Sequence, residues 1–152
     1  HEIIHREVMD ILGADIIFGI ENHHNFAWKE IFDNRELIIH RKGATPAGKD
    51  TYGYIPGTMA SEGYVIRGKG NPESLNSASH GAGRVMSRNA AKKRYSRIDV
   101  ESILKQKNVD LISAGIDEIP LAYKEINRVM DAQKDLVDVM AVFYPKLVKM
   151  AP

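Results

Sequence analysis

The segment Asn76–Arg84, NSASHGAGR, contains the residue types that most clearly suggest chemistry. Its imidazole, His80, is surrounded by serine, alanine and glycine, so little side-chain bulk would obstruct a ligand that approaches the ring and the backbone together. The following residues are expected to enter a helix whose free N-terminal amides bind phosphate, with Arg84 and Arg88 on one face as forked donors. An imidazole beside a phosphate can attack phosphorus. These residues alone leave two interpretations open: a phosphate loop with a nucleophile, or a glycine-rich turn with a surface histidine.

Two further histidine motifs could bind a metal ion. HEIIH, residues 1–5, matches the H-E-x-x-H zinc pattern, but a terminal helix frays, so a solvated helix is the favoured interpretation. In ENHHN, His23 and His24 are adjacent, and neighbouring side chains of an extended segment point to opposite faces. At most one of the two therefore joins a given metal site, and the spacing leaves open whether either one is a ligand or a structural histidine.

Two loops could contact an anionic ligand. YIPGTMASEGY places Pro56, Gly57, Thr58 and Met59 in a turn with exposed amides and one hydroxyl. HRKGATPAGK sets Arg41 and Lys42 among small residues, a basic loop that could follow a polyanion backbone. The alternative for such a loop is a solvated surface.

Hydrophobic periodicity predicts the elements that would position these residues. Helices are expected at 1–12, 81–93, 100–107 and 121–129, with a shorter one at 132–138. Strands are expected at 14–20, 51–55, 63–67 and 109–113 and within 137–148, together with a hairpin over 26–41 that turns at Asp33-Asn34. The pattern predicts a single α+β domain over residues 1–152, with mixed and antiparallel strands.

Composition narrows the class of protein. The 152 residues are 43% hydrophobic and include 21 basic and 20 acidic side chains, so any nucleic-acid binding must come from a local basic patch. The absence of cysteine excludes disulfides and thiolate ligands. No apolar run reaches the length of a membrane span, so we expect a cytoplasmic protein without a membrane partner.

Several motifs together, in this order, resemble the C-terminal half of the RtcB family of RNA ligases. They are NHHNFAWKE, HRKGATPAG, IPGTM, SASHGAGRVMSR, DEIPLAYKEI and FYPKLVKM. The resemblance implies an enzyme of RNA repair and tRNA splicing that uses GTP and Mn²⁺. Such a ligase joins an RNA 2′,3′-cyclic phosphate or 3′-phosphate end to a 5′-hydroxyl end. The histidine of SHGAGR attacks the α-phosphate of GTP, and the guanylate then passes to the RNA 3′-phosphate.

The resemblance assigns roles residue by residue. It makes His80 the nucleophile, His24 a manganese ligand and Asn25 a nucleotide contact, with His23 facing away. It makes the PGTM turn and the residues after His80 the nucleotide loops: Pro56, Gly57, Thr58, Met59, Gly81, Ala82 and Gly83. Tyr123 and Lys149 would lie near the guanine, and Arg84 and Arg88 would hold RNA or phosphate.

This sequence departs from the family pattern in three places. Gly63 stands where many members have a serine that contacts the nucleotide, and the usual terminal glycine is replaced by Met150-Ala151-Pro152. The family's N-terminal portion, which supplies most of the manganese ligands, has no counterpart here. The resemblance therefore implies a ligase part that is inactive alone and needs the missing half in trans, and that exposes an apolar face. The alternative is a non-catalytic remnant that binds nucleotide or RNA ends.

Overall fold

The structure is a computed structural model that describes residues 2–21, 23 and 25–150. It combines helices with mainly antiparallel strands, and one strand pair, β7–β9, is parallel. The predicted α+β class is thus confirmed. The elements along the chain are α1 (Glu2–Leu12), β1 (Asn25–Phe32), β2 (Arg35–Lys42), β3 (Ala44–Pro46), β4 (Tyr52–Ile55), β5 (Gly63–Gly68), η1 (Pro72–Ser74), β6 (Ser77–Ser79), α2 (Arg88–Arg94), α3 (Arg97–Gln106), β7 (Asp110–Ser113), η2 (Ile116–Glu118), η3 (Pro120–Ala122), α4 (Ile126–Asp131), β8 (Val137–Phe143) and β9 (Leu147–Lys149).

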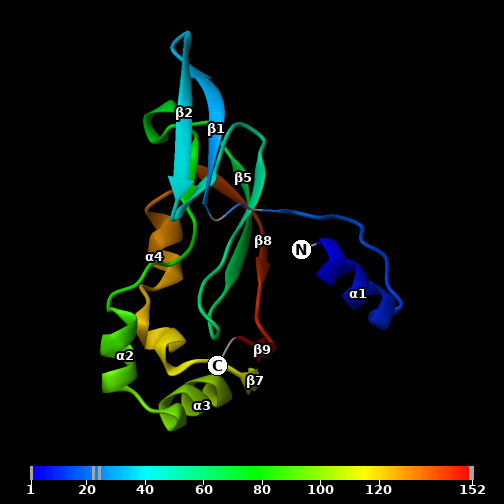
Figure 1. The fold of residues 1–152 in the computed structure, drawn as a ribbon, viewed down its shortest axis with the longest axis vertical. Coiled ribbons are helices and arrows are strands. Elements are labelled where there is room, and N and C mark those ends of the chain that lie inside the picture. The colour runs from blue at the N-terminus through cyan, green and yellow to red at the C-terminus, as the bar shows by residue number, and fades with distance from the viewer. Residues whose placement is uncertain (1, 22, 24, 151–152) are drawn as a thin grey trace.

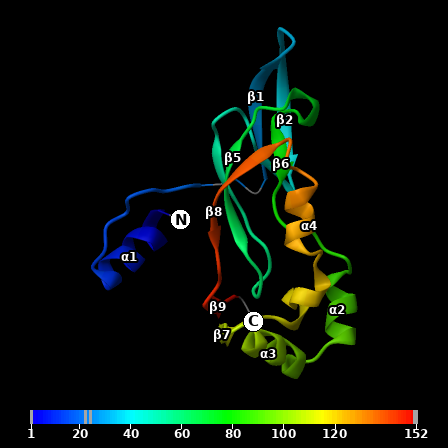
Figure 2. The same cartoon turned by 180° about the vertical axis from the view of Figure 1, so that it is seen from behind.

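The described strands form small sheets. The hairpin β1–β2 lies at one end of the molecule and α2 and α3 lie at the other (Figures 1 and 2). Between them, β5 pairs with both β4 and β8, and β6 pairs with β3. The predicted hairpin is confirmed, because Asp33 and Asn34 adopt positive φ values of 48° and 60° at its turn, as a two-residue turn between twisted strands requires.

Two apolar clusters hold the central elements together. One joins α2, α3, β7 and β9 through residues that include Met59, Leu104 and Ala122. The other joins the β4–β5–β8 sheet to α4 and includes Ala78 and Ala82. These two alanines stand two residues before and two residues after His80, so burial fixes the loop on both sides of its histidine.

Several predicted boundaries were wrong. The helix expected at 81–93 begins at Arg88, because Gly83 turns the chain with a φ of 72° and the Ser87 hydroxyl caps the helix by accepting from the Ala90 amide. The helix expected at 121–129 is split into η3 and α4, and no helix forms at 132–138, where a turn leads into β8. The strands expected at 51–55, 63–67 and 109–113 are confirmed as β4, β5 and β7.

The strand predicted at 14–20 is also wrong. This apolar run links α1 to β1, and Ile17 is 98% exposed, because no described strand lies beside it. The helix α1 stands apart from the rest of the molecule (Figure 1) and buries no residue. Most of its apolar side chains and those of β8 beyond Asp138, such as Ile11 and Phe143, are exposed, so the expected apolar surface is present. No described helix has both the length and the apolar character needed to cross a membrane.

Candidate nucleotide site around His80

A cavity of about 650 Å³ opens beside His80. Three loops that are far apart in the sequence meet there: the PGTM turn, the loop after β6 and the segment that contains η2 and Tyr123. Its volume lies in the usual range for small-molecule sites. The lining residues are Gly43, Pro56, Gly57, Thr58, Met59, His80, Gly81, Ala82, Gly83, Arg88, Glu118, Tyr123 and Met150.

The cavity brings together most of the residues to which a nucleotide role was assigned from the sequence. The PGTM turn, the SHGAGR glycines and Tyr123 all line it, and so does Arg88. Gly43, Glu118 and Met150 had received no role. Gly43 and Glu118 lie inside the motifs RKGATPAG and DEIPLAYKEI, and Met150 follows Lys149, so the motifs contained these residues but did not distinguish them from their neighbours.

The backbone around His80 is held by strand pairing. Just before it, β6 pairs antiparallel with β3, and the His80 amide then donates to the Gly43 carbonyl at 3.2 Å. His80 itself is half-buried, and its Nε2 atom is shielded from solvent. An imidazole that is held at a cavity wall in this way can serve as a nucleophile when it is neutral.

The PGTM turn is closed by hydroxyl groups. The Thr58 amide donates to Ser61 Oγ at 2.7 Å, and the two hydroxyls of Thr58 and Ser61 lie 2.9 Å apart. A Cβ atom on Gly57 would lie 2.1 Å from the Glu62 carbonyl oxygen, so only glycine fits there without a backbone shift. The close turn that lines the cavity therefore requires glycine at position 57, and Ser61 braces it.

Tyr123, Arg84 and Glu118 form a connected polar cluster at the cavity wall. Arg84 Nη1 donates to the Tyr123 hydroxyl at 2.8 Å, and the Tyr123 hydroxyl donates to the Glu118 carboxylate. Burial raises the pKa of the Tyr123 phenol, and the Glu118 hydrogen bond and charge raise it further, against the opposing charge of Arg84. Tyr123 is therefore a neutral phenol whose position is set from two sides.

Arg84 is held by protein acceptors. Besides its bond to Tyr123, its Nε donates to the Met86 carbonyl at 3.1 Å and its Nη2 to the Asp117 carbonyl at 2.5 Å. These bonds use three of the five N–H donors of the guanidinium, and its contact to phosphate stays a prediction.

Arg88 is the exposed cation at the cavity. Its side chain is 69% exposed, and it pairs with Glu118 at 3.1 Å and with Asp117 at 3.5 Å. Lys92, one helical turn further along α2, pairs with Asp117 at 3.5 Å. Burial alone would raise the pKa of the Asp117 carboxyl, but the hydrogen bond from its backbone and the charges of Lys92 and Arg88 outweigh burial and lower it.

The two basic residues at the end of β2, Arg41 and Lys42, differ in their exposure to solvent. Arg41 is 2% exposed and binds the Glu30 carboxylate with both terminal nitrogens. It also donates to Ser77 Oγ and to the Leu75 carbonyl, each at 2.8 Å. Because its donors are directed at protein groups, Arg41 does not fit the predicted contact with RNA or phosphate. Lys42, the next residue, is exposed.

Three predicted residues lie away from the cavity lining or outside the described residues. Asn25 begins β1, and its Oδ1 lies 2.5 Å from His40 Nε2. Lys149 is exposed on β9, where its neighbour Met150 lines the cavity instead. His24, the predicted manganese ligand, lies outside the described residues. Among the described residues no group of three or more histidine, aspartate or glutamate side chains could hold a metal ion, so this part of the chain does not fit a manganese centre by itself.

The departure at Gly63 has a steric cause. This residue begins β5, and a Cβ atom on it would lie 1.9 Å from the Tyr54 hydroxyl oxygen. A serine at this position would therefore displace the Tyr54 ring, which occupies the space that the serine side chain would need.

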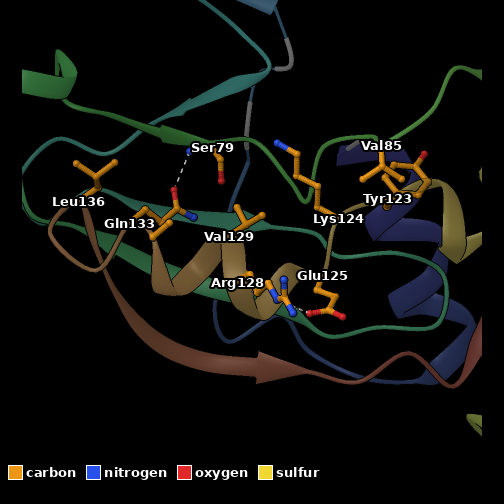
Figure 3. A pocket seen from close by; sticks show the side chains of 10 residues that line it. Ser79, Val85, Tyr123, Lys124, Glu125, Arg128, Val129, Gln133 and Leu136 are labelled. Carbon is orange, nitrogen blue, oxygen red and sulfur yellow. Dashed lines mark hydrogen bonds and ion pairs between the residues drawn. The ribbon is translucent and has the colours of Figure 1, made fainter.

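A second cavity of about 750 Å³ is lined in part by Tyr123, which also lines the first. It lies between α4 and the segment that carries Ser79 and Val85 (Figure 3). The Ser79 amide donates to Gln133 Oε1 at 2.9 Å, which ties the residue before His80 to the turn after α4.

Comparison with known proteins identifies the family. The sequence profile of the family described as "tRNA-splicing ligase RtcB" matches residues 2–150. RNA-splicing ligase RtcB of Escherichia coli (strain K12) is 47% identical over 121 residues, which cover 80% of this chain and 30% of that protein. The tRNA-splicing ligase RtcB of Nanoarchaeum equitans is 33% identical over 158 aligned residues, which cover 89% of this chain and 33% of that protein. The chain thus spans about a third of the length of these relatives, and it belongs to the RtcB family of RNA-splicing ligases.

Proposed function

We propose that this chain carries the nucleophile of an RNA ligase that uses GTP and Mn²⁺. The ligase would join RNA 2′,3′-cyclic phosphate or 3′-phosphate ends to 5′-hydroxyl ends. The observation that supports this function best is the convergence of three separate motifs on one cavity around His80. The cavity offers a tight glycine turn at Gly57, a fixed phenol at Tyr123 and an exposed cation at Arg88, a set suited to a nucleoside that carries phosphates.

In the proposed reaction, neutral His80 attacks the α-phosphorus of GTP. A P–N bond forms as the bond to pyrophosphate breaks. The guanylate then passes from His80 to an oxygen of the RNA 3′-phosphate, which frees the imidazole. Finally the RNA 5′-hydroxyl displaces GMP and forms the new phosphodiester.

Manganese enters this proposal through family membership. Mn²⁺ would neutralise phosphate charge when bound. His24 is the one ligand that this chain is proposed to contribute, and the other ligands would come from the part of the ligase that the chain does not span. The described residues hold no candidate set of their own.

The proposed function is tested by labelling His80. The chain is incubated with Mn²⁺ and α-³²P-GTP, alone and with the complementary segment of an RtcB relative added in trans, and protein-bound label is measured after denaturation. We expect acid-labile label with the added segment, and none in the His80→Ala variant.

The outcomes separate the two functions that the sequence leaves open. If neither mixture gives label but equilibrium binding of GTP or of an RNA 3′-phosphate persists, the chain is a non-catalytic binding remnant. If label forms equally on His80→Ala, the nucleophile has been assigned wrongly.

A further inference from the structure

The basic side chains of this protein are distributed unevenly. From residue 74 to residue 98 the sequence contains six of the 21 basic residues and none of the 20 acidic ones. The other residues of the chain carry 15 basic and 20 acidic side chains, so they are net negative although the whole chain is close to neutral. A local concentration of this kind can attract a polyanion that the overall charge would not.

This charge is continuous with the His80 cavity. Arg88, the first residue of α2, lines the cavity, and Lys92 lies one turn further along the same helix face. Lys93, Arg94 and Arg97 follow and are all exposed. We call Arg88, Lys92, Lys93, Arg94 and Arg97 the basic surface.

The acidic partners of Arg88 and Lys92 lie beneath the basic surface, whereas Arg97 pairs with the exposed Glu101 at 2.9 Å. Asp117 and Glu118 retain only 11% and 16% of their side-chain exposure, whereas Arg88 and Lys92, which pair with them, retain 69% and 59%. The carboxylates therefore hold the cations in place while the cations face solvent. The potential above α2 is positive, because the four cations of this helix lie over two carboxylates.

The end of α2 also offers a planar group to nucleobases. The Arg94 guanidinium lies 5.5 Å from the centroid of the Tyr95 ring, and Tyr95 packs partly against the core. Arginine and tyrosine planes stack on bases of any sequence, a contact that an acidic peptide does not offer. This feature favours single-stranded nucleic acid as the partner.

We infer that the basic surface binds the backbone of a single-stranded RNA whose 3′ end lies in the His80 cavity. The inference rests on the proposed function, because that function brings an RNA 3′-phosphate to His80, where it takes the guanylate. The RNA would pass from His80 over Arg88 and Lys92 toward Tyr95.

The test compares two double charge reversals in the 152-residue chain. Lys93→Glu with Arg94→Glu changes the basic surface outside the cavity. Arg35→Glu with Lys134→Glu makes the same change in net charge at the hairpin turn and after α4. Binding of a fluorescent 12-nucleotide RNA with a 3′-phosphate is measured by anisotropy between 50 and 300 mM KCl, without GTP or Mn²⁺, and far-ultraviolet circular dichroism checks folding.

We expect the Lys93→Glu/Arg94→Glu variant to bind at least about tenfold more weakly at 100 mM salt, with a salt slope reduced by roughly 1.4 for two lost phosphate contacts. The control pair should stay within about twofold of the unchanged chain, and Lys93→Arg with Arg94→Lys should retain binding. The inference would be overturned if both charge reversals weakened RNA binding equally. It would also be overturned if polyglutamate displaced the fluorescent RNA as effectively as unlabelled RNA does. The binding assay contains no GTP, so a negative result in it does not affect the interpretation of the His80 labelling experiment. A negative labelling result likewise does not affect this binding comparison.

Discussion

Arg41 is expected to stabilise the fold and not to contact phosphate. The sequence favours a phosphate contact for it, but the structure buries it between the hairpin and the segment that leads to β6. In the Arg41→Ala variant the Glu30 carboxylate loses its bidentate partner, and the acceptors on Ser77 and Leu75 lose their donor. Removing one partner of a buried ion pair costs about 3–5 kcal/mol, and Glu30 is 24% exposed, so we expect about 3 kcal/mol.

Urea denaturation followed by tryptophan fluorescence measures this loss, because Trp28 lies next to Arg41, whose guanidinium is 5.1 Å from the ring centroid. A loss of about 3 kcal/mol shifts the unfolding midpoint down by roughly 1–3 M urea. Arg41→Lys keeps the charge but cannot donate to Glu30, Ser77 and Leu75 together, so it should fall between Arg41→Ala and the unchanged chain. Arg35→Ala, at the exposed hairpin turn, is the matched control and should change stability by less than about 0.5 kcal/mol.

The structural role and the phosphate role of Arg41 predict different results. If Arg41 holds the hairpin, its loss lowers the unfolding midpoint and increases hydrogen exchange of the β1–β2 amides, while RNA affinity per folded molecule changes little. An unchanged midpoint combined with a large loss of RNA affinity would refute the assignment.

Three further predictions concern the cavity. Gly57→Ala should reduce GTP binding by at least about tenfold, since its Cβ would lie 2.1 Å from the Glu62 carbonyl oxygen and must displace the turn that lines the cavity. Calorimetric titration measures the affinity, and an unchanged value would contradict a role of this turn in nucleotide binding. Tyr123→Phe removes the hydroxyl between Arg84 and Glu118 and should cost about 1–2 kcal/mol of unfolding free energy in urea titrations. Because the pKa of Asp117 is lowered in the folded state, its ion pairs stabilise the protein fully above its ordinary pKa and are lost as the pH falls through the lower folded value. Asp117→Asn should therefore be less stable than the unchanged chain at pH 6, and in thermal melts the difference should shrink as the pH falls below the ordinary aspartate pKa of about 3.9. A difference that stays constant through this fall would argue against the ion pairs.

The local motifs could be recognised from the sequence because each is contiguous. The hairpin turn at Asp33-Asn34 and the small residues around His80 need only their neighbours to express their conformational preference. The order of such motifs along the chain is enough to indicate the family. The helix boundary at Arg88 was missed because the preference for helix after Gly81 was overridden by the positive φ of Gly83 and the cap at Ser87.

Exposure could not be predicted in the same way, because it depends on which distant segments come to lie against a residue. The apolar run at 14–20 has the pattern of a buried strand, yet no described strand covers it. Glu118 lines the cavity because η2 packs against α2, where Glu118 pairs with Arg88. Arg41 and Lys42 carry the same charge and are adjacent in the sequence, but they point to opposite faces of β2. The face that carries Arg41 is buried because Leu75 and Ser77, 34 and 36 residues later, supply acceptors there, and Lys42 stays in solvent.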